Sequence, residues 1–294
     1  MFCALIMAGG KGTRFWPKST EEKPKQFLNL IADKTMIQLT YNRLLKIMPK
    51  ERIFVVTGER YKKQVQNNLT DLPEKNIIIE PEGRNTAPCI LLACLYIKEI
   101  YKDATVAVVP SDHAIKNTDE FCNILQVANS YVENENRDAI VTIGITPNRP
   151  ETGYGYIKLK DKDGQVIKVD KFVEKPNLEK AKEYLEAGEY LWNAGMFIFD
   201  INSMLKELEA NYSGYNVLKE LPSIEEKEYT KKLKKLYPEC ESISIDYAVM
   251  EKSQSIYVVP GDFGWDDIGT WTSLERYIAK DESENILSRR CCNI

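Results

Sequence analysis

The residues best suited to chemistry in this 294-residue chain gather in a loop close to its start. The segment MAGGKGTRFWPKSTEEKPKQF follows a short apolar run and holds Gly9, Gly10 and Gly12, with Arg14 and Lys25 nearby. Glycines let backbone N–H groups approach phosphate oxygens, arginine can donate two parallel hydrogen bonds to an anion, and lysine adds compact positive charge. The loop therefore predicts a phosphate-binding site.

This loop departs from the two familiar phosphate-binding patterns. It lacks the Gly-Lys-Ser/Thr of a P-loop, and Phe15 stands where a dinucleotide fingerprint needs its third glycine. A GGKG turn alone is also compatible with a purely structural role. Lys11, Arg14 and the KPKQF segment in the same loop favour phosphate binding.

Two further motifs follow predicted strands. EPEGRNTAP opens a helix, where Asn85 and Thr86 either cap the helix or present amide and hydroxyl groups to a nucleotide base. VAVVPSDHAI places Pro110, Ser111 and Asp112 after a buried strand. Asp112 either makes a turn into the next helix or holds Mg²⁺ opposite the phosphate loop.

A fourth group of motifs lies in the second half: TGYGYI, FVEKP, WNAGMF and GWDDIGTW. A glutamate can accept hydrogen bonds from sugar hydroxyls, a lysine can meet a sugar phosphate, and an aspartate can complete a metal site. Each motif alone also fits ordinary surface or core sequence, so their joint position at strand ends carries the prediction. The candidate residues are Gly153, Glu174, Lys175, Asn193, Gly195, Asp266 and Asp267.

Composition excludes several classes of function. The 40 basic and 44 acidic residues give a net charge of −4 and are interleaved, which argues against nucleic acid or an anionic membrane as the main ligand. The apolar start lacks the features of a signal peptide, and no segment has the roughly 18 apolar residues of a membrane span. We expect a soluble, cytoplasmic protein.

Cysteine and histidine usage narrows the chemistry further. The seven cysteines are odd in number and show no CxxC spacing, so we expect free thiols rather than disulfides or a zinc site. His113 is the only histidine, which argues against a multi-histidine metal centre, and against a Ser-His-Asp triad unless His113 itself is the base. We expect His113 to be a structural neighbour of Asp112.

Alternating strands and helices are predicted to position these motifs. Short β-branched runs predict strands at 2–8, 52–57, 76–80, 104–109 and 139–145. Helical periodicity between them predicts helices at 36–47, 61–69, 87–101 and 118–132. This order indicates an α/β, Rossmann-like fold with a mixed, mostly parallel sheet covered on both faces, whose ligands bind at the carboxyl ends of the strands.

The pattern changes after Pro150. Residues 152–176 alternate around a DKDG turn and predict a small β-ribbon, and 190–200 reads as another strand. Helices are expected at 178–187, 201–208, 225–236 and 270–278, and a late strand at 255–260. No long linker separates the halves, so we expect them to share one sheet.

The seven motifs occur in the order found in sugar nucleotidyltransferases, and the chain resembles the mannose-1-phosphate guanylyltransferase branch over residues 2–277. RFWPKS, PKQF and GRNTAP favour this branch over the glucose enzymes. The resemblance implies a Rossmann-like fold and the reaction of GTP with mannose 1-phosphate to give GDP-mannose and pyrophosphate, with Mg²⁺.

The resemblance also implies roles for individual residues. The GTP phosphates would be held by Gly9, Gly10, Gly12 and Arg14, with Lys25 near the α-phosphate. Guanine and ribose would be surrounded by Asn85, Thr86, Pro110 and Ser111. Mannose 1-phosphate would be positioned by Gly153, Glu174, Lys175, Asn193 and Gly195. The metal ligands would be Asp112 and Asp267, because Asp266 sits at what resembles a variable position.

The resemblance gives an expected domain plan. Residues 1–280 would form a catalytic domain, with a nucleotide-binding half at 1–150 and a sugar-phosphate half at 151–280, followed by a short tail at 281–294. Family members usually continue into a β-helix and some into an isomerase domain, so we expect no isomerase activity here. We expect a monomer or homodimer without nucleic-acid or membrane partners.

Three alternatives stay open from the sequence. The chain could be a guanylyl- or uridylyltransferase for another sugar 1-phosphate, a metal-dependent glycosyltransferase, or an inactive nucleotide-sensing homologue. A glycosyltransferase would not need the basic glycine loop, because it expels no pyrophosphate. An inactive homologue has no chemical reason to keep Arg14, Lys25, Asp112, Lys175 and Asp267 together.

Overall fold

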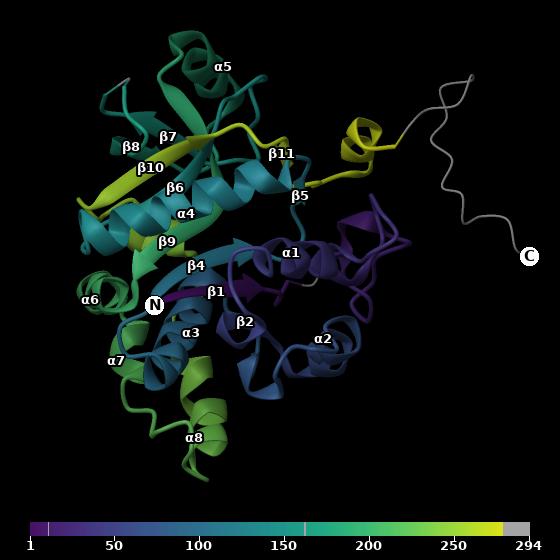
Figure 1. Cartoon of the computed structure of the whole chain (residues 1–294), viewed down its shortest axis with the longest axis vertical. Coiled ribbons are helices and arrows are strands. Elements are labelled where there is room, and N and C mark those ends of the chain that lie inside the picture. Colours follow the sequence, from purple (N-terminus) through teal and green to yellow (C-terminus); the bar gives the residue numbers. More distant parts are fainter. Residues whose placement is uncertain (11, 162, 279–294) are drawn as a thin grey trace, which may run out of the picture.

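The computed structural model describes residues 1–10, 12–161 and 163–278. Its centre is a nine-stranded sheet in the order β3-β2-β1-β4-β9-β6-β10-β8-β7 (Figure 1). Strands from both halves of the chain belong to this sheet, which confirms the expected α/β, Rossmann-like fold with one shared sheet.

The first half supplies the parallel part of the sheet. β1 (Phe2–Met7) lies between β2 (Ile53–Gly58) and β4 (Thr105–Pro110), and β3 (Ile77–Glu80) pairs with the outer side of β2. Almost every residue of β1, β2 and β4 is buried, as expected for parallel strands covered on both faces. The carboxyl ends of β1, β3 and β4 therefore meet at one edge, where the first three motifs begin.

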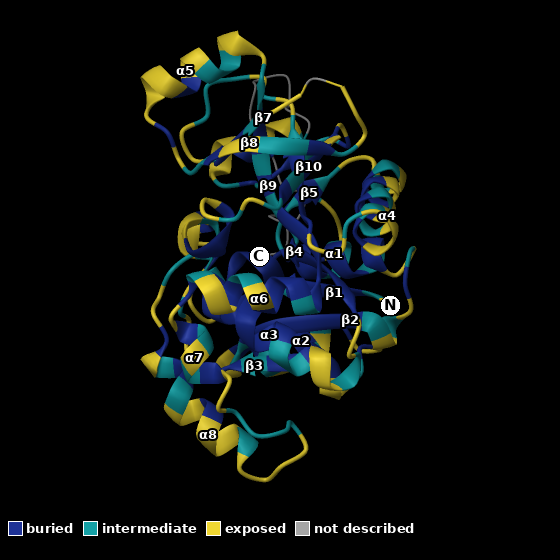
Figure 2. Cartoon of the chain, turned by 90° about the vertical axis from the view of Figure 1, so that its left-hand side faces the viewer, coloured by how far each residue is buried: buried dark blue, intermediate teal, exposed yellow. Residues whose placement is uncertain are grey.

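Helices cover both faces of this sheet (Figure 2). On one face, α3 (Thr86–Ile100) and α6 (Ile201–Asn211) contribute to the same buried cluster. On the other face lie α1 (Met36–Leu44), α2 (Lys62–Asn68) and α4 (Thr118–Asn134). Side-chain caps define several of their starts: Thr35 and Gln38 form a capping box on α1, and Asn117 caps α4.

A long antiparallel strand joins the two halves. β9 (Tyr190–Asp200) lies between β4 and β6 (Ile140–Ile145), antiparallel to both. β10 (Ile256–Gly261) then runs parallel to β6. The predicted ribbon is the hairpin of β7 (Tyr156–Leu159) and β8 (Ile167–Val173), which closes this side of the sheet.

Some boundaries differ from the sequence expectations. α5 (Leu178–Ala187) has the expected bounds, whereas α8 (Tyr229–Leu236) begins four residues later than expected because 225–228 form a turn. The helix expected at 270–278 is a short 3₁₀ helix, Trp271–Arg276. The proposed tail at 281–294, with Cys291 and Cys292, lies outside the described residues.

Several short elements were not expected from the sequence. β5 (Ala114–Ile115) pairs antiparallel with β11 (Trp265–Asp266), and a π-helical turn spans Asp246–Met250. A fourth short element, α7 (Gly214–Leu218), lies beside α6. None of the helices in the described ranges is long and apolar enough to cross a bilayer.

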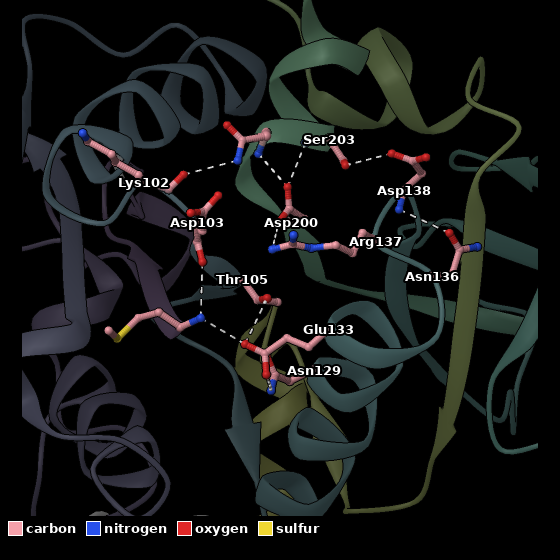
Figure 3. A network of polar contacts seen from close by, with 12 residues as sticks. Lys102, Asp103, Thr105, Asn129, Glu133, Asn136, Arg137, Asp138, Asp200 and Ser203 are labelled. Carbon is pink, nitrogen blue, oxygen red and sulfur yellow. Dashed lines mark hydrogen bonds and ion pairs between the residues drawn. The ribbon is translucent and has the colours of Figure 1, made fainter.

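Polar contacts hold the edge of the sheet opposite the motifs (Figure 3). Asp200 caps α6 by accepting from the backbone N–H of Ser203, and it pairs with Arg137 at 3.3 Å. The N-terminal ammonium group of Met1 donates to Glu133 on α4 at 3.1 Å. These contacts fasten helices from both faces to the amino ends of β1 and β4, so this edge is structural and the opposite edge is free to bind ligands.

Candidate functional site

The motifs of the two halves meet in a pocket of about 260 Å³ at the carboxyl edge of the parallel strands. Eight residues predicted from the sequence line it: Thr86, Pro110, Gly153, Glu174, Lys175, Asn193, Gly195 and Asp267. Its wall also includes Met7, His113, Tyr154, Ile245, Asp246 and Trp265. The other predicted residues do not line this pocket: Gly9, Gly10, Gly12, Arg14, Lys25, Asn85, Ser111, Asp112 and Asp266.

The glycine loop after β1 is shaped by the PKQF segment. The carboxamide of Gln26, a buried residue, donates to the carbonyl oxygens of Ala8 at 3.0 Å and of Gly10 at 3.1 Å. Gly12 has φ of +52°, and a Cβ there would lie 2.6 Å from the backbone nitrogen of Lys25. Only glycine fits this position without strain. Gln26 is therefore a supporting residue that the sequence reasoning did not single out.

Lys25 brings the two predicted metal ligands together. Its side chain is only 7% exposed, its Nζ lies 3.0 Å from Asp112 Oδ2, and it donates to the backbone carbonyl of Asp267. Burial, the largest single cause, acts to raise the pKa of Asp112, but the charge of Lys25, the neighbouring His113 and the hydrogen bonds to the carboxylate together lower this pKa below its ordinary value. Asp112 is therefore held as a carboxylate beside the phosphate loop.

The two neighbouring aspartates of the WDDIG motif differ in their surroundings. Asp266 is buried, accepts from the backbone N–H of Ile268 at 2.8 Å and pairs with Arg276 at 2.5 Å. Asp267 lines the pocket, and its Oδ1 accepts from the hydroxyl of Tyr154 at 2.7 Å. The geometry therefore gives Asp266 a structural role and leaves Asp267 the better metal ligand of the two.

His113 and Trp265 form a fixed part of the pocket wall. The indole N–H of Trp265 donates to His113 Nδ1 at 3.0 Å, and their rings meet edge to face. Burial lowers the pKa of His113 to about 4, so the imidazole is neutral at neutral pH and can accept this hydrogen bond. The contact is consistent with the expectation that His113 is a structural neighbour of Asp112, and it joins the residue before β5 to the first residue of β11.

In the second half of the chain, the FVEKP motif turns a carboxylate inward and an ammonium group outward. The Glu174 side chain is 9% exposed, whereas Lys175 is 59% exposed and contacts it as an ion pair. A Cβ at Gly155 would lie 2.5 Å from Glu174 Oε2, so the TGYGYI glycine makes room for this carboxylate. Gly153 lies at the rim, where its N–H donates to Glu151 at 3.1 Å.

The WNAGMF motif lies at an irregularity of β9. The register with β6 shifts between Thr142 and Gly144, and Gly195 has φ of +66° at this point. Asn193 Oδ1 accepts from the hydroxyl of Thr142 at 3.1 Å and from the N–H of Gly195 at 3.0 Å. Bulges of this kind re-aim side chains, and here the amide of Asn193 is fixed with its Nδ2 toward the pocket residue Asp246 at 3.1 Å.

Asp246 was not singled out in the sequence, although it lines the pocket. Burial, followed by the nearby charge of Glu174, raises the pKa of Asp246 to about 6. The only sequence signal was SISIDYAVM, where one acidic residue stands among apolar residues and two serines. Its position beside Asn193 depends on tertiary structure, because 53 residues separate the two in the chain.

The residues predicted around guanine have different environments. Asn85, with φ of 68°, caps α3 by accepting from the N–H of Thr86, as the simpler interpretation of the motif expected. Thr86 lines the pocket, and its hydroxyl accepts from the N–H of Ile245 at 2.8 Å. Ser111 is buried, with its carbonyl accepting from Thr40 at 3.2 Å.

The remaining predicted residues lie on the loop. Arg14 is exposed on the short 3₁₀ helix Thr13–Phe15. Gly10 is exposed as well, with open space where a Cβ would lie, whereas Lys11 lies outside the described residues. Within the described part of the chain, no group of three or more His, Cys, Asp or Glu side chains could hold a metal ion. A cation at Asp112 and Asp267 would need further oxygen ligands from substrate or water.

Comparison with known proteins shows the family of the chain. Residues 3–284 match the family model of nucleotidyl transferases. The chain is 39% identical over 297 residues to a mannose-1-phosphate guanylyltransferase of Salmonella montevideo, covering 97% of this chain and 62% of that relative. It is also 39% identical over 296 residues to one of Escherichia coli, covering 97% of this chain and 63% of that relative.

A solved structure extends the comparison to three dimensions. The structure described as mannose-1-phosphate geranyltransferase from Thermus thermophilus has a TM-score of 0.84 and 33% sequence identity, covering 95% of this chain and 80% of that one. The present chain spans less than two thirds of the length of the Salmonella and Escherichia relatives.

Proposed function

The chain belongs to the nucleotidyl transferase family, and from this premise we propose that it transfers the guanylyl group of GTP to mannose 1-phosphate, giving GDP-mannose and pyrophosphate. The observation that carries the proposal is Lys25, which joins the phosphate loop to Asp112 and to the backbone of Asp267. The names of the similar relatives support guanosine and mannose as the nucleoside and the sugar.

The chemistry required matches the residues available. The phosphate of a sugar 1-phosphate is already an anionic nucleophile, so the reaction needs no general base. Its barrier lies in bringing two anions together in line with the pyrophosphate leaving group. Lys25, Arg14 and the N–H groups of the glycine loop would screen this repulsion and hold the triphosphate. The neutral His113 is consistent with a site that moves no proton.

A divalent cation, which we propose to be Mg²⁺, fits the donor set. Asp112 and Asp267 offer hard carboxylate oxygens, and both residues contact the same ammonium group of Lys25. Mg²⁺ is usually held by one or two carboxylates together with substrate phosphates and water. When bound, it would neutralise charge on the α-phosphate and the leaving group. The lowered pKa of Asp112 keeps that carboxylate ionised.

Each half of the chain would bind one of the two substrates. We place GTP on residues 1–150, with its phosphates at the glycine loop and its base near Asn85, Thr86, Pro110 and Ser111. Mannose 1-phosphate would lie on residues 151–280, against Gly153, Glu174, Lys175, Asn193 and Gly195. We propose a cytoplasmic monomer or homodimer that acts without nucleic acid or a membrane.

The test is pyrophosphate release by the purified chain with Mg²⁺, each nucleoside triphosphate in turn and a panel of sugar 1-phosphates. We expect release with GTP and mannose 1-phosphate to exceed that with every other pair. Absence of release with this pair would overturn the proposal, and a preference for UTP or another sugar would replace it with a sibling activity. Asp267→Asn serves as the inactive control.

A further inference from the structure

We propose that Asp246 is a substrate-binding residue, which accepts hydrogen bonds from sugar hydroxyls together with Glu174 and restricts the pocket to neutral sugars. This inference rests on the proposed function, because it concerns the sugar phosphate that the pocket would take. It adds a residue that the motif assignments above do not contain, and it predicts which sugar 1-phosphates the pocket rejects.

The first support is the way Asp246 is held. Asn193 Nδ2 donates to its Oδ1 at 3.1 Å, and Asn193 is itself fixed by Thr142 and by the N–H of Gly195. The preceding residue, Ile245, is anchored by its N–H, which donates to the hydroxyl of Thr86 at 2.8 Å. Asp246 thus has a fixed orientation at the start of its π-helical turn, as a ligand-positioning residue requires.

The second support is unused acceptor capacity at the pocket surface. An ionised carboxylate offers about four lone-pair sites. Asn193, the side chain of Ser244 and the backbone N–H of Asp246 itself use part of this capacity, while Asp246 still lines the pocket. Sugar hydroxyls are donors that match the remaining sites. A carboxylate placed here only for stability would have no reason to face the cavity.

The third support is the distribution of charge around the pocket. Glu174 and Asp246 are close enough for the negative charge of Glu174 to raise the pKa of Asp246. Two cations border this pair of carboxylates. Lys175, mostly exposed at the rim, contacts Glu174 as an ion pair and its charge acts to lower the pKa of Asp246, and Lys25 lies with Asp112 on the other side of the site. A neutral sugar ring can therefore contact the carboxylates while its phosphate faces the cations.

The same distribution predicts what the pocket rejects. A hexuronic acid 1-phosphate would bring a third carboxylate against Glu174 and Asp246, and like charges in a partly buried site repel. We therefore expect neutral hexose 1-phosphates to be substrates and their uronic acid counterparts to be excluded.

The test compares the wild type with Asp246→Asn and with the control Tyr247→Phe, an exposed neighbour on the same turn. A hydrogen bond to a charged group corresponds to roughly a 10- to 100-fold effect. We expect Asp246→Asn to raise KM for mannose 1-phosphate by about this factor, with KM for GTP changed by less than about twofold. Tyr247→Phe should leave both constants unchanged.

Single-deoxy analogues of mannose 1-phosphate make the test position-specific. In the wild type, removal of the hydroxyl that contacts Asp246 should lower kcat/KM by about 10-fold or more, and in Asp246→Asn the same removal should have little effect. Equal losses in both proteins for every analogue would overturn the inference, because a merely structural residue lowers activity without regard to hydroxyl position.

The remaining outcomes separate a failure of this inference from a failure of the proposed function. If the wild type shows no turnover with any pair of substrates, the proposed function fails, whereas an active wild type with an unaffected Asp246→Asn variant overturns this inference alone. If Asp246→Asn does not fold, the wild type is tested with mannuronic acid 1-phosphate. Turnover comparable with mannose 1-phosphate overturns the inference, and rejection supports it.

Discussion

The carboxyl group of Glu80 makes the stability of this fold depend on pH. Glu80 ends β3 and is 4% exposed, and the hydroxyl of Tyr237 donates to its Oε1. Its Oε2 lies 2.6 Å from the position that a Cβ on Gly9 would occupy, so it also borders the glycine loop. Burial raises the pKa of Glu80 to about 7 from an ordinary value of 4.5.

The sign of the effect follows from proton binding. Because its pKa is raised in the folded state, Glu80 binds its proton more tightly when folded than when unfolded. Its contribution to stability is therefore fully present below about pH 4.5 and is lost as the pH rises toward 7. At about 1.4 kcal/mol per pKa unit, the loss is about 3 kcal/mol.

The perturbation is Glu80→Gln, which keeps the shape and removes the charge. Between about pH 5 and pH 8, we expect the free energy of unfolding of the wild type to fall by roughly 2 to 3 kcal/mol relative to the variant. For a chain of this size, such a change moves Tm by about 5 °C. Urea unfolding and thermal melts of both proteins at each pH measure the difference directly.

A matched control separates this effect from general titration. Glu183 is an exposed glutamate on α5, and Glu183→Gln should differ from the wild type by the same small amount at every pH. If the difference between Glu80→Gln and the wild type is likewise independent of pH, the reasoning about Glu80 is wrong.

Three further predictions concern the phosphate side of the pocket. Gln26→Leu removes both hydrogen bonds to the glycine loop, so it should lower the free energy of unfolding by about 2 kcal/mol and raise KM for GTP severalfold. Urea unfolding and initial rates measure the two effects. An unchanged KM would show that the loop keeps its shape without Gln26. Lys25→Met should lower kcat by about 100-fold or more in the pyrophosphate assay, because the variant loses the buried cation that we place beside the reacting phosphates. Near-normal turnover would show that Lys25 has no role in catalysis. Asp267→Asn should abolish most turnover with folding intact. Asp266→Asn should mainly lower Tm, because of the two aspartates only Asp266 pairs with a neighbouring arginine. The reverse pattern would exchange the roles of the two residues.

The elements and the motif positions followed from local sequence patterns. β-branched runs bounded by turn residues identified the strands of the parallel half, and the alternation around DKDG identified the hairpin of β7 and β8. Strand order and pairing did not follow in the same way. That β9 would insert antiparallel between β4 and β6 depends on the packing of both halves, and its own sequence shows only that it is a buried strand.

The contacts that orient the residues of the site could not be predicted from local sequence patterns, for the same reason. Lys25 contacts the carbonyl of Asp267 across 242 residues of sequence, and Asn193 contacts Asp246 across 53. Neither separation corresponds to a helical or strand period, so no local pattern links the partners. The sequence identified side chains with suitable chemistry, whereas the residues that orient them were visible only in three dimensions.

The continuity of the sheet through β9 limits how the site can move. The pairing of β9 with β4 on one side and β6 on the other ties the two halves through backbone hydrogen bonds. A hinge that swung the halves apart would have to break this ladder. We therefore expect any opening and closing around the proposed substrates to involve surface loops, such as the glycine loop and the 151–155 turn. Product release should depend on loop motion, with the sheet serving as a rigid frame.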